Sequence, residues 1–124
     1  MNTPAEKKEP DCEFLNHINS IIVDNLTMDG LGVSFIADSM CMSPSTLFRK
    51  VKANTGTGIN EYIRNVRLER VVKILTDERE KKNVAICDAA FSCGFSSLSS
   101  FAKAFKKKYG VSATRYIEGN NKAV

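Results

Sequence analysis

The feature that most constrains the fold is an internal repeat, in which residues 37–63 recur in outline at 90–117. Ala37 and Ser43 match Ala90 and Ser96 at an offset of 53 residues. At an offset of 54, the residues Leu47, Val51, Lys52, Gly56, Tyr62 and Ile63 match Phe101, Phe105, Lys106, Gly110, Tyr116 and Ile117. One inserted residue explains the change of offset. Each copy predicts a helix-turn-helix unit: a short helix with a small alanine, a turn, a serine cap, a cation-bearing helix and a glycine.

Apolar residues recur at helical spacing and predict an all-α fold of about seven helices, with no strand. The helices are expected at 11–26, 33–40, 44–54, 58–75, 84–92, 97–109 and 112–118. They form one domain, 11–118, whose two helix-turn-helix subdomains (11–56 and 83–118) are joined by a long linker helix within 57–76. Residues 1–10 are expected to be a disordered lead or linker, 76–83 a solvated loop and 119–124 a polar tail.

Local signals mark the ends of the two cation-bearing helices. Ser43 can cap the first, because its hydroxyl accepts hydrogen bonds from free amides and the proline after it loses none. Ser96 or Ser97 is expected to cap the second. Gly56 and Gly110 favour the left-handed backbone that ends a helix.

Positive charge is concentrated in the repeat. The chain carries a net charge of +4, but residues 39–75 carry +5 and residues 96–109 carry +4. The second helix of each copy has cations and no acid: Arg49, Lys50 and Lys52 in the first, Lys103, Lys106, Lys107 and Lys108 in the second. A plain bundle of helical hairpins would also explain the repeat, yet it needs no such coincidence. The charge placement favours a polyanionic partner.

Other function classes find little support in the sequence. There is no paired-carboxylate constellation, no glycine-rich nucleotide motif, and His17 is the only histidine, so an enzyme is not expected. No C-x-x-C pair occurs, so we expect no metal site and no cofactor. Cys41, Cys87 and Cys93 have apolar neighbours and are expected in the core. No segment is long and apolar enough to span a membrane, which favours a cytoplasmic protein.

Two sets of motifs carry a family resemblance. The first copy has Ile36-Ala37, the run Met42 to Lys52, Gly56, Tyr62-Ile63 and Arg67-Leu68. The second has Ala89-Ala90, Cys93-Gly94-Phe95, Phe101, Phe105-Lys106-Lys107, Tyr109-Gly110 and Tyr116. Over about residues 14–117 these motifs resemble the DNA-binding domain of AraC/XylS transcription regulators. The departures are Val51, Ala113 and Ile117, where that family usually has an aromatic residue, proline and arginine.

The resemblance implies which residues meet DNA. The positions facing bases would be Ser45, Phe48 and Arg49 in the first recognition helix, and Leu98, Ser99, Ala102 and Lys103 in the second. The positions facing phosphates would be Ser43, Thr46, Lys50, Lys52, Ser96, Ser100, Lys106 and Lys107. Arg49 can bond guanine with two hydrogen bonds, whereas Phe48 can only touch a thymine methyl or a sugar. As alternatives, Phe48 could be a core residue and Leu98 could pack at its helix start.

The implied function is sequence-specific binding of double-stranded DNA to regulate transcription. Recognition helices at about 44–54 and 97–109 would enter successive major grooves, about 34 Å apart. RNA polymerase is the expected protein partner. The isolated domain would be a monomer and a full-length regulator a dimer. The resemblance extends to output domains of hybrid two-component sensors, with a stand-alone regulator as the alternative.

A helical protein-interaction module is the rival from another function class. Amphipathic basic helices also bind acidic partners or membrane surfaces. In that case Phe48, Phe101 and Leu98 would form one exposed apolar patch.

Overall fold

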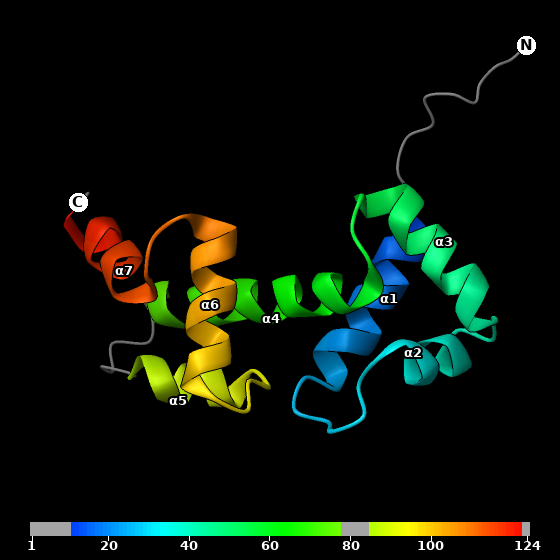
Figure 1. The fold of residues 1–124 in the computed structure, drawn as a ribbon, viewed down its shortest axis with the longest axis horizontal. Helices are drawn as coiled ribbons and strands as arrows, with labels where there is room; N and C mark the ends of the chain where they lie inside the picture. Colours follow the sequence, from blue (N-terminus) through cyan, green and yellow to red (C-terminus); the bar gives the residue numbers. More distant parts are fainter. Residues whose placement is uncertain (1–10, 78–84, 123–124) are drawn as a thin grey trace, which may run out of the picture.

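The protein folds as seven α-helices within residues 11–77 and 85–122, which are the residues that this computed structural model describes (Figure 1). They are α1 Cys12–Asp24, α2 Val33–Ser39, α3 Pro44–Thr55, α4 Ile59–Thr76, α5 Ile86–Ser92, α6 Leu98–Tyr109 and α7 Ala113–Lys122. No strand occurs in these ranges, so the expected all-α fold is confirmed. The lead expected at 1–10 and the loop residues 78–83 lie outside the described residues.

Helix ends follow the capping signals of the sequence. The side chains of Asp11, Ser43 and Ser97 accept hydrogen bonds from backbone amides in the first turns of α1, α3 and α6. Each such bond satisfies an amide that has no partner within the helix. Gly56 and Gly110 end α3 and α6 with φ of 80° and 83°, a left-handed backbone that suits glycine. The expected starts and stops of both cation-bearing helices are therefore confirmed, with Ser97 rather than Ser96 as the cap.

Two hydrophobic clusters make up the core, and α4 contributes to both. The first cluster is formed by buried residues of α1 to α3 and the start of α4: Phe14, Ile18, Ile22, Ile36, Ala37, Leu47, Val51, Ile59 and Ile63. The second is formed by the later part of α4 and the elements after it: Leu68, Val71, Ala89, Ala90, Cys93, Phe95, Phe101, Phe105 and Ala113. The shared helix is thus the structural link between the halves.

The arrangement places α3 and α6 far apart along α4. In Figure 1, α4 runs along the long axis, with α1, α2 and α3 gathered at its N-terminal end and α5, α6 and α7 at its C-terminal end. The helix α6 crosses α4, whereas α3 lies beyond the opposite end. Each half therefore carries one of the two cation-bearing helices, α3 or α6, and α4 connects the halves.

The two turns inside the repeat differ by one residue, and the structure shows where. After α2, the amide of Met42 donates to the Ala37 carbonyl at 3.0 Å; after α5, the amide of Phe95 donates to the Ala90 carbonyl at 3.1 Å. Up to these turns, matching residues of the two copies lie 53 positions apart. At the caps the offset becomes 54, because Ser97 caps α6 as Ser43 caps α3. Ser96 is the inserted residue, so the predicted match of Ser43 with Ser96 was wrong.

Cys41 and the C-terminal segment differ from expectation. Cys41 is exposed, at a φ of 57° in the turn after α2, because it occupies the turn position that Gly94 takes in the second copy. Its prediction as a core thiol was wrong; Cys93 is buried as expected and Cys87 is half-buried. At the other end, α7 continues through Gly119 to Lys122, four residues beyond the expected end at 118. A glycine inside a helix weakens it without forcing it to stop.

Candidate nucleic-acid interface

One side of α3 packs on the core and the other faces solvent. Leu47 and Val51 are fully buried in the first cluster. On the opposite side, helical spacing brings four exposed residues together: Ser45, Phe48, Arg49 and Lys52. A stripe with a hydroxyl, an aromatic ring and two cations is suited to contact both base edges and phosphates.

The same stripe recurs on α6 at an offset of 54. Phe101 and Phe105 are buried in the second cluster, and the Phe105 ring lies 4.5 Å from the Tyr109 ring and 5.7 Å from the Tyr116 ring, centroid to centroid. On the exposed side lie the counterparts of the α3 stripe: Ser99, Ala102, Lys103 and Lys106. The repeat in the sequence is therefore also a repeat of exposed side chains.

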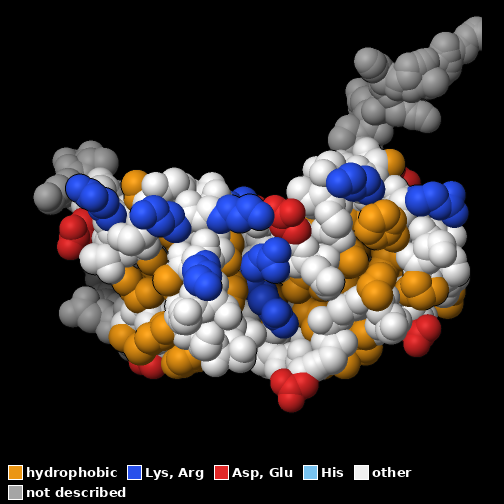
Figure 2. All heavy atoms as spheres, viewed as in Figure 1, with side chains coloured by type: hydrophobic (Ala, Val, Ile, Leu, Met, Phe, Trp, Pro, Cys, Tyr) orange, Lys and Arg blue, Asp and Glu red, His pale blue; other side chains and the backbone are white. Residues whose placement is uncertain are grey.

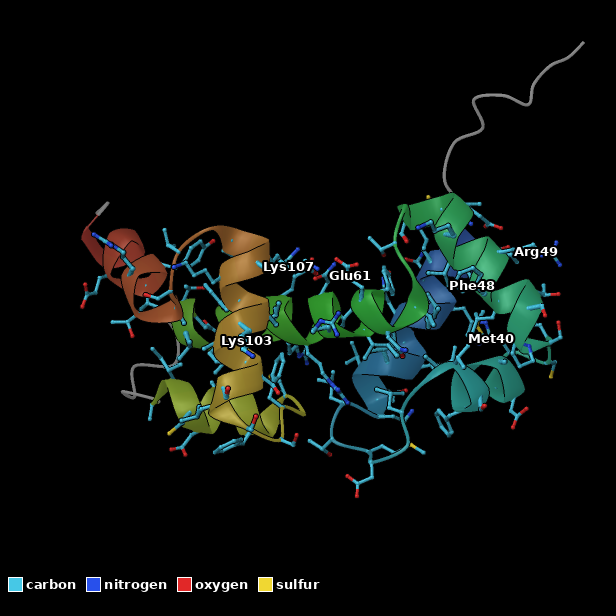
Figure 3. The ribbon with its side chains drawn as sticks, in the orientation of Figure 1. Met40, Phe48, Arg49, Glu61, Lys103 and Lys107 are labelled. Atoms are coloured by element: carbon cyan, nitrogen blue, oxygen red, sulfur yellow. The ribbon has the colours of Figure 1, made fainter. Side chains whose placement is uncertain are left out.

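Both stripes are visible from one side of the molecule. Figure 3 shows Phe48 and Arg49 on α3 and Lys103 and Lys107 on α6, all seen in the same view. In Figure 2, which shows that face, basic side chains gather over α6 and the neighbouring part of α4, and over α3 basic side chains lie beside hydrophobic ones. One flat partner of sufficient length could touch both helices together.

Phe48 and Leu98 are surface residues. Their exposed fractions are 52% and 47%, so the alternatives that placed them in the core or packed at a helix start are wrong. Phe101, in contrast, is buried. The single apolar patch of Phe48, Phe101 and Leu98 that an interaction module would need is therefore absent from the described surface.

The family follows from a comparison with known domains. A family model described as a helix-turn-helix domain, of the AraC type, matches residues 36–119, which span both bihelical units and the linker. The chain belongs to the AraC-type helix-turn-helix family. DNA binding in the regulation of transcription is the function of this domain.

Named relatives and a solved structure agree with this assignment. The chain is 30% identical over 106 residues to Histidine kinase P4 of Formosa agariphila, covering 86% of the chain and 7% of that protein. It is 33% identical over 113 residues to the bifunctional transcriptional activator/DNA repair enzyme AdaA of Bacillus subtilis, covering 91% and 51%. The DNA-binding domain of AdpA, solved with a target DNA, has the same fold, with a TM-score of 0.70, 20% identity and coverage of 90% and 93%. The chain spans about half or less of these two curated relatives.

In this AraC-type domain, the first turns of α3 and α6 carry hydroxyl groups. The Ser43 hydroxyl accepts from the Thr46 amide at 3.1 Å and donates to the Thr46 hydroxyl at 3.0 Å. Ser96 and Ser100 are exposed at the start of α6. These four residues, all expected near phosphates, lie at helix N-termini, where the backbone also favours anions.

The lysines of the AraC-type domain differ in what holds them. Lys52, Lys106 and Lys107 are exposed and project from their helices, as expected of phosphate contacts. The Lys50 ammonium lies 4.9 Å from the centroid of the Phe14 ring, a cation–π contact between α3 and α1. The Lys108 ammonium lies 3.5 Å from the Glu69 carboxylate on α4 and 5.4 Å from the Tyr109 ring centroid. Lys50 and Lys108 therefore contribute to contacts within the protein.

Two arginines of α4 received no site role from the sequence, although Arg67 belongs to the motif Arg67-Leu68. Arg67 is half-buried and donates from both Nε (3.2 Å) and Nη2 (2.7 Å) to the Leu26 carbonyl oxygen. Burial lowers the pKa of Arg67, and the nearby Cys93 partly offsets this. Arg64 is exposed and faces the region between α4 and α6. The charge of +5 over residues 39–75 contains both arginines and was the available signal.

The described residues show no sign of a metal-ligand cluster or a membrane-spanning helix. Within residues 11–77 and 85–122, no three histidine, cysteine, aspartate or glutamate side chains gather as metal ligands would. Among the helices of these same residues, none has both the length and the apolar character needed to cross a membrane.

Proposed function

We propose that this chain binds double-stranded DNA with α3 and α6 in two successive major-groove segments, as the DNA-binding part of a longer transcription regulator. The observation that carries the proposal is that α3 and α6 carry matching stripes of exposed residues. Each residue of the α6 stripe lies 54 positions after its counterpart on α3. An AraC-type neighbour of the same fold, AdpA, was solved with a target DNA, which supports the same use of this surface.

The two helices are expected to contribute differently to recognition. On α3, Arg49 would donate two hydrogen bonds to a guanine, worth roughly 1–3 kcal/mol of discrimination, and Phe48 would pack on a thymine methyl. Ser45 would donate to either kind of base. On α6, Lys103 offers one long cation and Ser99 one hydroxyl. The other two positions, Ala102 and Leu98, offer only apolar contacts. We therefore infer that α3 supplies most of the sequence preference.

Phosphate contacts would fix the register of both helices on the duplex. We assign them to the exposed cations and the hydroxyls of the first turns: Ser43, Thr46, Lys52, Ser96, Ser100, Lys106 and Lys107. We leave Lys50 out, because its ammonium packs on Phe14. Such contacts hold the protein in place without reading sequence.

Several properties of the longer protein belong to the same proposal. Similarity to part of a histidine kinase supports an origin in a two-component protein. We propose with it that the longer protein dimerises through its other parts, contacts RNA polymerase and is cytoplasmic. We also propose that this segment catalyses no reaction. The domain limits 11–56, 57–76 and 83–118 are also proposed; the two core clusters divide within the linker segment, between residues 63 and 68 of α4.

The decisive experiment is selection of bound duplexes from random DNA, followed by footprinting and a salt titration. We expect protection of two segments one helical turn apart and a log-log salt slope of about −4 to −8, as for four to nine phosphate contacts. A protein-interaction module would give no enriched sequence and a slope near zero. Either of those results, or protection of one segment alone, would contradict the proposal.

A further inference from the structure

Two adjoining hollows lie between α4 and α6, beside the exposed stripe of α6, with which the second hollow shares Lys103. The first, of about 290 Å³, is lined by residues of both halves, including Leu31, Asn60, Arg67 and Phe95. The second, of about 300 Å³, is lined by Arg64, Ser100, Lys103, Ala104 and Lys107. Arg64 and Ser100 line both hollows. We call Arg64, Ser100, Lys103 and Lys107 the central seat.

The chemistry of the central seat suits an anion. It combines one guanidinium, two ammonium groups and a hydroxyl, all on exposed residues. No acidic residue lines either hollow, and Glu61 of α4, which lies near Lys107 in Figure 3, forms no ion pair with it. Among the described residues, no hydrogen bond or ion pair holds the Arg64, Lys103 or Lys107 side chain. The contrast with Lys108, which pairs with Glu69, shows that cations of α6 can be held by α4 where a carboxylate is present.

Arg64 of the central seat and its neighbour Arg67 have different roles. Both bonded nitrogens of Arg67 are directed at the Leu26 carbonyl, so this side chain fixes the packing beneath the seat. Arg64 lies almost one helical turn earlier on α4 and is exposed, so its guanidinium is available to a ligand. A planar guanidinium with several donors is well matched to phosphate oxygens.

The place of the seat identifies which anion it would meet. It lies where α6 crosses α4, on the side of α6 that faces α3, as the position of Lys107 in Figure 3 shows. If α3 and α6 occupy successive major grooves, the narrow groove between them faces α4, and backbone phosphates border it. We propose that the central seat binds a phosphate of the DNA backbone between the two major-groove segments. This inference rests on the proposed function.

The test compares Arg64→Gln with Arg70→Gln on a selected duplex. Arg70 is an exposed arginine of the same helix that lines other hollows, with Lys73. We expect Arg64→Gln to make the salt slope shallower by about 0.9 and to weaken binding at about 0.1 M salt roughly five- to tenfold. Arg70→Gln should change neither. Equal slopes for wild type and Arg64→Gln would overturn the inference while leaving the proposed function intact.

A second measurement uses the unaltered protein. Neutral methylphosphonates replace the phosphates midway between the two protected segments. Wild type should bind this duplex more weakly than the natural one. Arg64→Gln, which already binds the natural duplex more weakly, should lose almost no further affinity. Undiminished binding by wild type would overturn the central seat, whereas failure of wild type to bind any natural duplex would overturn the proposed function together with it.

Discussion

Gly94 and Leu26 approach each other so closely that a Cβ on Gly94 would overlap the Leu26 carbonyl oxygen. Leu26 follows α1 in the first half, and Gly94 follows α5 in the second. Arg67 of the linker helix donates two hydrogen bonds to that same oxygen. The contact of these three residues therefore joins the halves.

Gly94→Ala should strongly destabilise the protein. The residue has a φ of +103°, and the added Cβ would also lie 2.6 Å from the Arg67 Nε. Backbone strain and the collision together should lower the free energy of unfolding by at least about 2 kcal/mol. Urea denaturation followed by circular dichroism measures this change.

Gly56→Ala is the matched control for Gly94→Ala. Gly56 also has a positive φ, of +80°, but no atom lies within 4 Å of the place that an added methyl group would take. Only backbone strain remains, so a loss of about 1 kcal/mol is expected. Equal losses for the two variants would show that the approach of Gly94 to Leu26 does not matter for stability.

Arg49→Ala should relax sequence preference at one base position. Removing two hydrogen bonds to a guanine should reduce discrimination there by about 1–3 kcal/mol, while other positions keep theirs. Binding is compared on the selected duplex and on duplexes with single base changes. If the variant ranks all of these duplexes as wild type does, Arg49 reads no base.

Lys106→Ala and Lys108→Ala should differ, although the residues are two positions apart. Lys106 is exposed, so its loss should weaken binding to all sequences alike and make the salt slope shallower by about 0.9. Lys108 pairs with Glu69 at 3.5 Å, so its loss should leave the slope unchanged. The stability effect of that surface pair is expected within about 1 kcal/mol. A common change in slope would contradict the distinction.

Much of the fold could be predicted because its signals are local. Helical spacing of apolar residues indicated each helix, and the serine and glycine signals marked the ends of α3 and α6 to within a residue. The position of the inserted residue was less certain, because Ser96 and Ser97 are chemically identical and only the cap geometry distinguishes them. Cys41 was misplaced for a related reason: its apolar neighbours say nothing of a left-handed turn.

The rest depended on contacts between distant segments. Neither the pairing of Lys108 with Glu69 nor the packing of Lys50 on Phe14 follows from sequence spacing within one helix. The exposure of Phe48 beside the buried Leu47 depends on the crossing of α3 with its neighbours. Arg64 was overlooked because its helix was treated as a linker, and its surroundings become visible only once α6 crosses α4.

Thiol reactivity should separate the cysteines by burial. Cys12 and Cys41 are exposed and should react quickly with a thiol reagent at mildly alkaline pH, whereas buried Cys93 should react only on unfolding. Burial also raises the pKa of the Cys93 thiol in the folded protein. The stability that the neutral thiol contributes is therefore complete below the pKa of the unfolded chain, and it is lost as the pH rises through the pKa of the folded protein. Mass spectrometry of labelled peptides identifies the order. Fast labelling of Cys93 in the native protein would contradict its place in the second core cluster.

Phe48 should make binding depend on a thymine methyl group. Its ring is 52% exposed on the recognition stripe and has no hydrogen-bonding group, so only apolar base edges can favour it. Replacing the contacted thymine by uracil removes one methyl and leaves every hydrogen bond in place. Wild type should then lose about 0.8 kcal/mol, roughly fourfold in affinity. Phe48→Ser should bind the two duplexes alike, because the ring that senses the methyl is gone. A scan of single uracils along the α3 segment finds the position, and equal responses of both proteins at every position would exclude this contact.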